Sequence, residues 1–184
     1  MELNRNVFIL LFLLVLPGLN SGAYANTIPT EMQKLGEGQA YYLKFIKVYD
    51  ATLYWLEQVE GKNILSSDVS KCLSLEYVVD IGKKDFIKAA NSVLKRQFSR
   101  EQLAPVSSEI ETFHQSYQDV RDGDSYTLCY NSMEKVTSLS YNRSNISTIH
   151  SPAFAEIYFS IWLGNSNPLD ENLRDDLLAG LQNN

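Results

Sequence analysis

Three neighbouring side chains in the segment FIKVYDATLYW, residues 45–55, carry groups that could do chemistry. They are the phenol of Tyr49, the carboxylate of Asp50 and the hydroxyl of Thr52, and a phenol or a carboxylate can transfer protons in catalysis. The segment alternates as a β-strand does, so Tyr49 lies on one face and the other two groups on the opposite face. They do not converge on one substrate. Because both faces are largely apolar, the pattern also predicts a strand that is covered on both sides.

The other sequence patterns that usually indicate a catalytic or metal-binding site are absent or incomplete. The sequence has no G-x-S-x-G, no H-E-x-x-H and no phosphate-binding or dinucleotide-binding glycine motif. His114 and His150 have no cysteine or acidic partners at zinc spacing, and the turn at 122–124 lacks the further acidic positions of a calcium loop. We therefore expect no metal and no cofactor. His114 with Cys129 is a possible thiol–imidazole pair, but a satisfied histidine at the edge of a core is the more usual role.

Aromatic residues form a second group with functional potential. The chain has eleven tyrosines, eight phenylalanines and two tryptophans. Several fall on segments expected to face one another: Tyr41, Tyr42, Tyr49, Tyr54, Trp55, Tyr158 and Trp162. Such side chains could line a pocket for a flat or oily ligand, or could form an ordinary aromatic core.

The elements that must position these side chains follow from the hydrophobic period. Alternation predicts strands at 39–44, 45–55, 71–80, 126–130, 135–141 and 145–149, of which the first two could run as one. Apolar stripes at steps of three and four predict helices at 85–98 and 105–120, from Ser151-Pro152 to Gly164, and from Asn167-Pro168 to Leu181. The order predicts an α+β fold, an antiparallel sheet with helices packed against it.

The helix at 85–98 has a basic outer face. Its cations and those flanking it are Lys84, Lys88, Lys95, Arg96 and Arg100. Such a face is usually solvated, and the alternative is a patch for an anion or a membrane surface. The formal net charge of −6 argues against nucleic acid as a partner.

The N-terminal 25 residues are typical of a cleavable secretory signal. Residues 7–16 are an unbroken apolar run, which is too short to span a membrane, and Ala23-Tyr24-Ala25 supplies small residues for a signal peptidase. We expect cleavage after Ala25, a single domain at 26–184, and export without a later membrane span. In an oxidising compartment Cys72 and Cys129 could form a disulfide; otherwise they are two small buried hydrophobes.

Three ordered segments resemble the chalcone isomerase-like family, in particular its small exported bacterial members. They are LGEG at 35–38 with the strand FIKVYDATLY at 45–54, the turn DGDSY at 122–126, and IWLG at 161–164 followed by Asn167-Pro168 and residues 173–178. The resemblance implies a curved antiparallel sheet with helices layered on one face and a cleft between the layers. It also implies a periplasmic location.

The catalytic set of the plant enzymes in that family, which close a chalcone into a flavanone, is not kept here. Their arginine aligns with Ala40, their strand threonine with Tyr49, and their helix threonine with Ile161, one residue after Ser160. Asn91 is a candidate match for their asparagine. Members that lack these residues are associated with fatty-acid binding.

The resemblance and the aromatic pattern together predict a non-catalytic protein that binds a small hydrophobic molecule, a fatty acid or an aromatic compound. The expected ligand-binding residues are Tyr41, Tyr49, Tyr158, Ile161 and Trp162. One alternative is an isomerase or lyase of altered specificity that uses Tyr49 with Thr52 or Ser160. Another is a periplasmic interaction module that uses the basic face of the helix at 85–98.

Overall fold

The computed structural model describes residues 28–56 and 63–181, and the predicted signal with its cleavage site at Ala25 lies outside them. Six antiparallel strands form one sheet in the order in which they occur in the chain. They are β1 (Gln33–Tyr42), β2 (Ile46–Trp55), β3 (Lys71–Tyr77), β4 (Ser125–Asn131), β5 (Val136–Tyr141) and β6 (Ser144–Ile149). The predicted α+β class and antiparallel sheet are confirmed.

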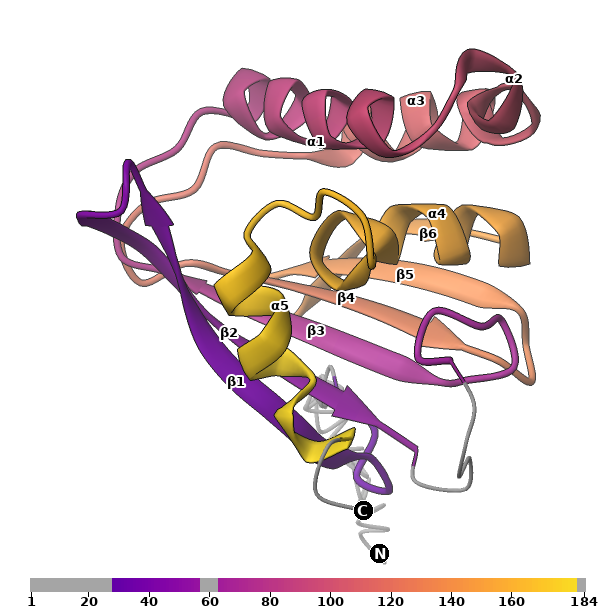
Figure 1. The fold of residues 1–184 in the computed structure, drawn as a ribbon, viewed down its shortest axis with the longest axis horizontal. Coiled ribbons are helices and arrows are strands. Elements are labelled where there is room, and N and C mark those ends of the chain that lie inside the picture. The colour runs from indigo at the N-terminus through magenta and orange to yellow at the C-terminus, as the bar shows by residue number, and fades with distance from the viewer. Residues whose placement is uncertain (1–27, 57–62, 182–184) are drawn as a thin grey trace, which may run out of the picture.

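The helices come in two groups, and Figure 1 shows both on the same side of the sheet. The first group lies between β3 and β4 and comprises α1 (Lys83–Gln97), α2 (Arg100–Leu103), a 3-10 turn (Ala104–Val106) and α3 (Ser107–Ser116). The second group follows β6 and comprises α4 (Pro152–Leu163), α5 (Glu171–Leu177) and a 3-10 turn (Ala179–Leu181). In Figure 1, α4 lies between the sheet and the layer of α1 and α3, and α5 lies against β1.

The prediction that the strand at 45–55 is covered on both sides is wrong. Tyr49, Ala51, Leu53 and Trp55 are buried beneath the helices, whereas the residues between them are only half-buried. Helices cover one face alone, so β2 follows the inward–outward alternation of a sheet with one solvated face. Phe45 is not part of the strand, and its side chain is 87% exposed.

Two helix predictions need correction at their boundaries. The predicted helix at 105–120 is instead the end of the 3-10 turn, which holds Pro105, followed by α3, which ends at Ser116. Val120 instead pairs with Ile81 in an isolated antiparallel bridge, so the end of the apolar stripe is extended chain. The last helix begins later than predicted because the Asp170 carboxylate, rather than Asn167, accepts from a backbone N–H of α5, that of Leu173.

A tight turn joins β1 to β2, so the two predicted strands form a hairpin rather than one long strand. Phe45 N donates to Tyr42 O at 3.2 Å, and Leu43 and Lys44 between them have φ of 51° and 65°. Left-handed backbone at both central positions is a type I′ turn, which normally favours Asn-Gly. The tip exposes Tyr42, Leu43 and Phe45, and Figure 1 shows it rising from the sheet toward the helical layer.

Of the two roles considered for the cysteines, the structure has the disulfide. Cys72 on β3 and Cys129 on β4 face each other across the two central strands and are joined Sγ to Sγ. The bridge spans 57 residues of chain that include α1, α2 and α3. The first helical group therefore lies within a disulfide-closed loop that leaves the sheet at β3 and returns at β4.

The C-terminal helix packs unusually close to the first strand because glycines line the contact. A Cβ atom added at Gly36 would collide with the backbone carbonyls of Asp176 and Leu177. One added at Gly38 would lie 2.8 Å from the Asp176 Cβ, and one at Gly180 would collide with the Leu35 carbonyl. The glycine pair of the sequence thus serves backbone-to-helix packing of α5 on β1.

Candidate ligand cavity

A cavity of about 820 Å³ lies between the sheet and the helices. The sheet forms its floor, α1 and α3 form its roof, and the end of α4, the start of α5 and the β1–β2 hairpin close its sides. Its lining is mainly aliphatic and aromatic, with four charged side chains: Asp80, Asp85, Lys88 and Asp170. This size and composition fit a site for a small apolar molecule.

Tyrosines from three adjacent strands provide the polar groups of the floor. Tyr49 on β2 is directly opposite Tyr77 on β3, and their ring centroids are 5.4 Å apart. Tyr126 on β4 comes next, 6.1 Å from Tyr77. Because alternate residues of a strand share a face, antiparallel register places these three phenols side by side beneath the helices.

The end of α4 contacts this floor through Trp162. Its indole Nε1–H donates to the Tyr49 hydroxyl at 3.1 Å, and both side chains are buried. The roof adds Phe86 from α1, whose ring stacks on Tyr117 just beyond the end of α3 with centroids 5.4 Å apart. An aromatic wall therefore surrounds the cavity from sheet to roof.

Four of the five predicted ligand-binding residues line this cavity: Tyr41, Tyr49, Ile161 and Trp162. Tyr158 does not line it. Its side chain is fully buried between α4 and α3, in contact with the Phe113 ring, and its hydroxyl is 2.7 Å from that of Tyr117. One turn of helix separates Tyr158 from Trp162, and the earlier turn faces the packed core.

The sequence did not single out Tyr77, Tyr117, Tyr126 or Phe86 as site residues. All four line the cavity. Alternation puts Tyr77 on the same face of its strand as Leu73 and Leu75, where a tyrosine is typical of the core. One feature of the sequence could have indicated that Tyr77 lines a site. It lies at the end of the strand, and the apolar alternation continues beyond it to Val79, which also lines the cavity.

Burial keeps the cavity phenols protonated. It is the main cause that raises the pKa of Tyr49, with the nearby Asp170 carboxylate acting in the same direction, and it raises the pKa of Tyr77 and Tyr117 well above the usual value. Burial also raises the pKa of Tyr126, to about 12. These side chains are therefore neutral hydrogen-bonding groups at physiological pH.

The other side chains considered for catalysis lie elsewhere. Thr52 is on the solvated face of β2, opposite to Tyr49. The Ser160 hydroxyl hydrogen-bonds to two oxygens outside the cavity lining, Ile157 O at 2.6 Å and the Gln97 side-chain oxygen at 2.7 Å. Neither it nor Asn91 lines the cavity. Cys129 is in the disulfide, which rules out the thiol–imidazole pair with His114.

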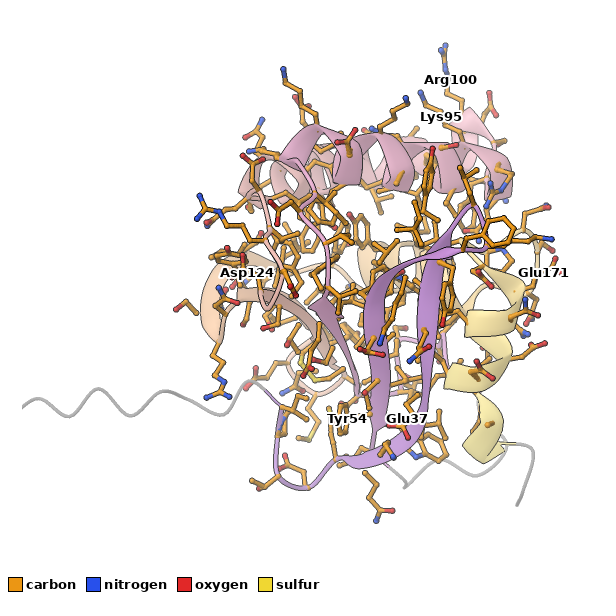
Figure 2. All side chains as sticks on the ribbon, turned by 90° about the vertical axis from the view of Figure 1, so that its left-hand side faces the viewer. Glu37, Tyr54, Lys95, Arg100, Asp124 and Glu171 are labelled. Atoms are coloured by element: carbon orange, nitrogen blue, oxygen red, sulfur yellow. A yellow bond between two sulfur atoms is a disulfide. The ribbon has the colours of Figure 1, made fainter. Side chains whose placement is uncertain are left out.

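The basic face of α1 is largely solvated. Figure 2 shows Lys95 and Arg100 pointing away from the sheet on the far side of the helical layer. Arg96 instead has a structural role, since its guanidinium donates to Pro168 O at 2.7 Å and so ties α1 to the segment that leads into α5. Within 28–56 and 63–181 there is no cluster of three metal-ligating side chains, and no helix there has the length and apolarity to cross a bilayer.

We expect His114 to make the stability of the protein sensitive to acid. Its side chain is buried in α3, its Nε2 has no hydrogen-bond partner among the described residues, and burial lowers its pKa to about 4. Between pH 6.5 and 4 the unfolded chain binds a proton there that the folded chain does not. We expect acidification across this window to cost about 2 kcal/mol of unfolding free energy, and His114→Leu to flatten the profile. Urea denaturation at several pH values measures this, with the exposed His150→Leu as the control; an unchanged slope in His114→Leu contradicts it.

The comparisons with known proteins agree with this geometry. The family model described as chalcone isomerase-like matches residues 27–179. Among solved structures, a fatty-acid-binding protein of Arabidopsis thaliana superposes with a TM-score of 0.61 at 16% identity, covering 84% of this chain and 90% of that one. No curated protein matches the sequence.

Proposed function

Because this chain belongs to the chalcone isomerase-like family, we propose that it is a non-catalytic protein that binds a small hydrophobic molecule, an acyl chain or an aromatic compound. The observation that carries the proposal is the cavity of about 820 Å³ with its aromatic and aliphatic lining. Ligand cavities in proteins fall in this range and have a few polar groups set among apolar ones. Here those polar groups are the hydroxyls of the floor tyrosines.

The acyl alternative is supported by the Arabidopsis protein of similar fold, which is described as a fatty-acid-binding protein. The aromatic alternative is supported by the lining itself, because Tyr49, Tyr77 and Phe86 present ring faces and edges suited to a flat molecule.

The lack of catalysis is supported by what occupies the positions of the plant enzymes' catalytic side chains. Ala40 stands in place of the arginine and lines the cavity with a methyl group, which cannot stabilise a phenolate. Tyr49 and Ile161 replace the two threonines. If the protein were instead an isomerase with Tyr49 as a general acid, it would turn over chalcones or other enones, and Tyr49→Phe would abolish that turnover.

We further propose that the protein is exported to the periplasm. Support comes from the signal-like pattern of residues 1–25 and from the disulfide between Cys72 and Cys129, since disulfides persist in oxidising compartments.

Extraction of ligand from purified protein, followed by native mass spectrometry and thermal shift, tests the binding proposal. Ala89 on α1 lines the cavity and is also exposed, so it lies at the rim, whereas the exposed Ser92 does not line the cavity. We expect Ala89→Trp to narrow the entrance and to weaken binding of an acyl or aromatic ligand about tenfold, which corresponds to about 1.4 kcal/mol. Ser92→Trp is the matched control and is expected to bind as the wild type does. A protein that carries no ligand, and whose Tm no acyl or aromatic compound shifts, contradicts the proposal.

A further inference from the structure

The hydroxyl of Tyr77 borders the cavity and has no hydrogen-bond partner in the described part of the chain. Tyr77 lines the cavity floor, its side chain is 3% exposed, and it makes no hydrogen bond with residues 28–56 or 63–181. Its ring contacts are with Tyr49, Phe86 and Tyr126. Buried polar groups in proteins nearly always have a hydrogen-bond partner. The molecule that fills the cavity is therefore expected to supply this one.

Tyr49 offers a second hydroxyl beside it. The indole N–H of Trp162 donates to the Tyr49 oxygen, which fixes the phenol in place but leaves its own proton without an acceptor among the described residues. By contrast, the Tyr126 hydroxyl is already satisfied, since it accepts from Gln118 N at 2.7 Å and donates to Gln118 O at 3.0 Å. The cavity thus holds two neutral, adjacent phenols with hydrogen-bonding capacity to spare.

The charges around the cavity oppose a negatively charged ligand. Asp80, Asp85 and Asp170 line it, and Lys88 is the one cation among its described lining residues. Lys88 is exposed, as Asp80 and Asp85 are, so none of these three acts strongly on an anion held deep against the floor; the half-buried Asp170 carboxylate, which acts on the Tyr49 hydroxyl, opposes one there. A carboxylate moved into such an apolar interior without a buried cation loses far more hydration than it regains.

The buried cation of the described chain is elsewhere. Lys71 is fully buried, but its ammonium donates to Ser66 O and Val69 O, both at 3.1 Å, and lies over the rings of Tyr130 and Phe159. None of these residues lines the cavity. At the cavity wall, where the plant enzymes carry arginine, this chain has Ala40.

We propose that the cavity selects an uncharged, carbonyl-bearing apolar molecule, such as an amide, ester, ketone or quinone, whose oxygen accepts from the hydroxyls of Tyr77 and Tyr49. The ionised form of a fatty acid is selected against. This inference rests on the proposed ligand-binding function and narrows it to a ligand class.

Dodecanamide and dodecanoate test it, because they have the same chain and nearly the same shape but differ in charge at pH 8. Binding to the purified protein is measured by native mass spectrometry and by thermal shift, with dodecane as a probe of the chain alone. We expect dodecanamide to bind at least about tenfold more tightly than dodecanoate. Tyr77→Phe removes one oxygen and should weaken dodecanamide about fivefold while leaving dodecane unchanged, as expected for one lost hydrogen bond. Tyr54→Phe removes a hydroxyl from the solvated face of β2, outside the cavity, so it is the matched control and should not alter dodecanamide binding.

The outcomes separate the two proposals. If none of the three probes binds, and no aromatic compound does either, the ligand-binding function itself fails. If dodecanoate binds as tightly as dodecanamide, or if Tyr77→Phe binds dodecanamide as the wild type does, the neutral-ligand inference is overturned and the binding function stands. Should Tyr77→Phe not fold, the comparison of the two probes on the wild-type protein decides alone.

A gain-of-function variant gives an independent arm of the same test. Ala40→Arg places a guanidinium in the cavity wall, at the position where its relatives among the plant enzymes hold an arginine. A buried Arg–carboxylate pair is strong and often bidentate, so dodecanoate should then bind more tightly than dodecanamide. A variant that keeps the wild-type preference would show that charge does not set the selectivity.

Discussion

Replacing both cysteines by alanine, Cys72→Ala with Cys129→Ala, is expected to lower the free energy of unfolding by about 4 kcal/mol. The bridge closes a loop with a sequence separation of 57 residues, and the chain-entropy relation for a loop of that length gives this value. Alanine is small and apolar, so the site between β3 and β4, where Cys72 is buried and Cys129 half-buried, stays free of unsatisfied polar groups. The unfolded chain gains freedom while the folded sheet changes little.

Guanidinium denaturation of the two proteins measures the difference. Dithiothreitol provides the control, because it should move the wild-type transition toward that of the variant and leave the variant where it is. Equal midpoints for oxidised wild type and variant would mean that the cross-link does not stabilise the fold.

Gly36→Ala is expected to cost about 3 kcal/mol, the upper part of the range for overpacking a well-filled site. The added methyl group would collide with the carbonyls of Asp176 and Leu177, which are backbone atoms and cannot rotate away. To relieve the collision, α5 must move off β1. Asp170, the N-cap of α5, lines the cavity, so the displacement should also reduce ligand affinity.

Gly82→Ala is the matched control, since a Cβ there would lie 3.5 Å from its nearest neighbour, an ordinary contact distance. Thermal and chemical denaturation of both variants measure the effect, and ligand titration follows the cavity. If Gly36→Ala is as stable as Gly82→Ala, α5 can move away from β1 at little cost in free energy, and the prediction is wrong.

The sequence was informative where a local pattern decides the structure. Alternation placed Tyr49 and Leu53 on the same face of β2, which the structure shows to be the inward one. The Ser151-Pro152 start signal located α4, where the Ser151 hydroxyl accepts from Phe154 N. Patterns of this kind depend on backbone period and capping, which are local properties. The predicted boundaries of the helix at 105–120 were wrong at both ends. Pro105 falls inside a 3-10 turn, and the apolar stripe continues beyond α3 into extended chain.

The candidate site could not be assembled from the sequence, because it depends on which strands pair. Alternation shows which residues of a strand share a face, but it does not show which strand lies beside it. Tyr77 and Tyr126 are neighbours of Tyr49 only because β3 and β4 pair across the first helical group. The same pairing brings Cys72 opposite Cys129, which is why the sequence left the disulfide open. Trp162, which belongs to a family motif, lines the cavity, whereas Tyr158, one turn earlier, packs into the core.

The turn at Leu43-Lys44 has a consequence for how fast a ligand enters and leaves. Two L-residues in left-handed backbone cost about 1 kcal/mol each, and the exposed apolar tip makes few stabilising contacts. Tyr41, Tyr42 and Ile46 on either side of this turn are cavity wall. We therefore expect this part of the wall to open locally more readily than the central strands, which are cross-linked. If the proposed ligand occupies the cavity, we expect it to exchange by local opening of the hairpin, at a rate set by that segment and not by the global stability of the fold.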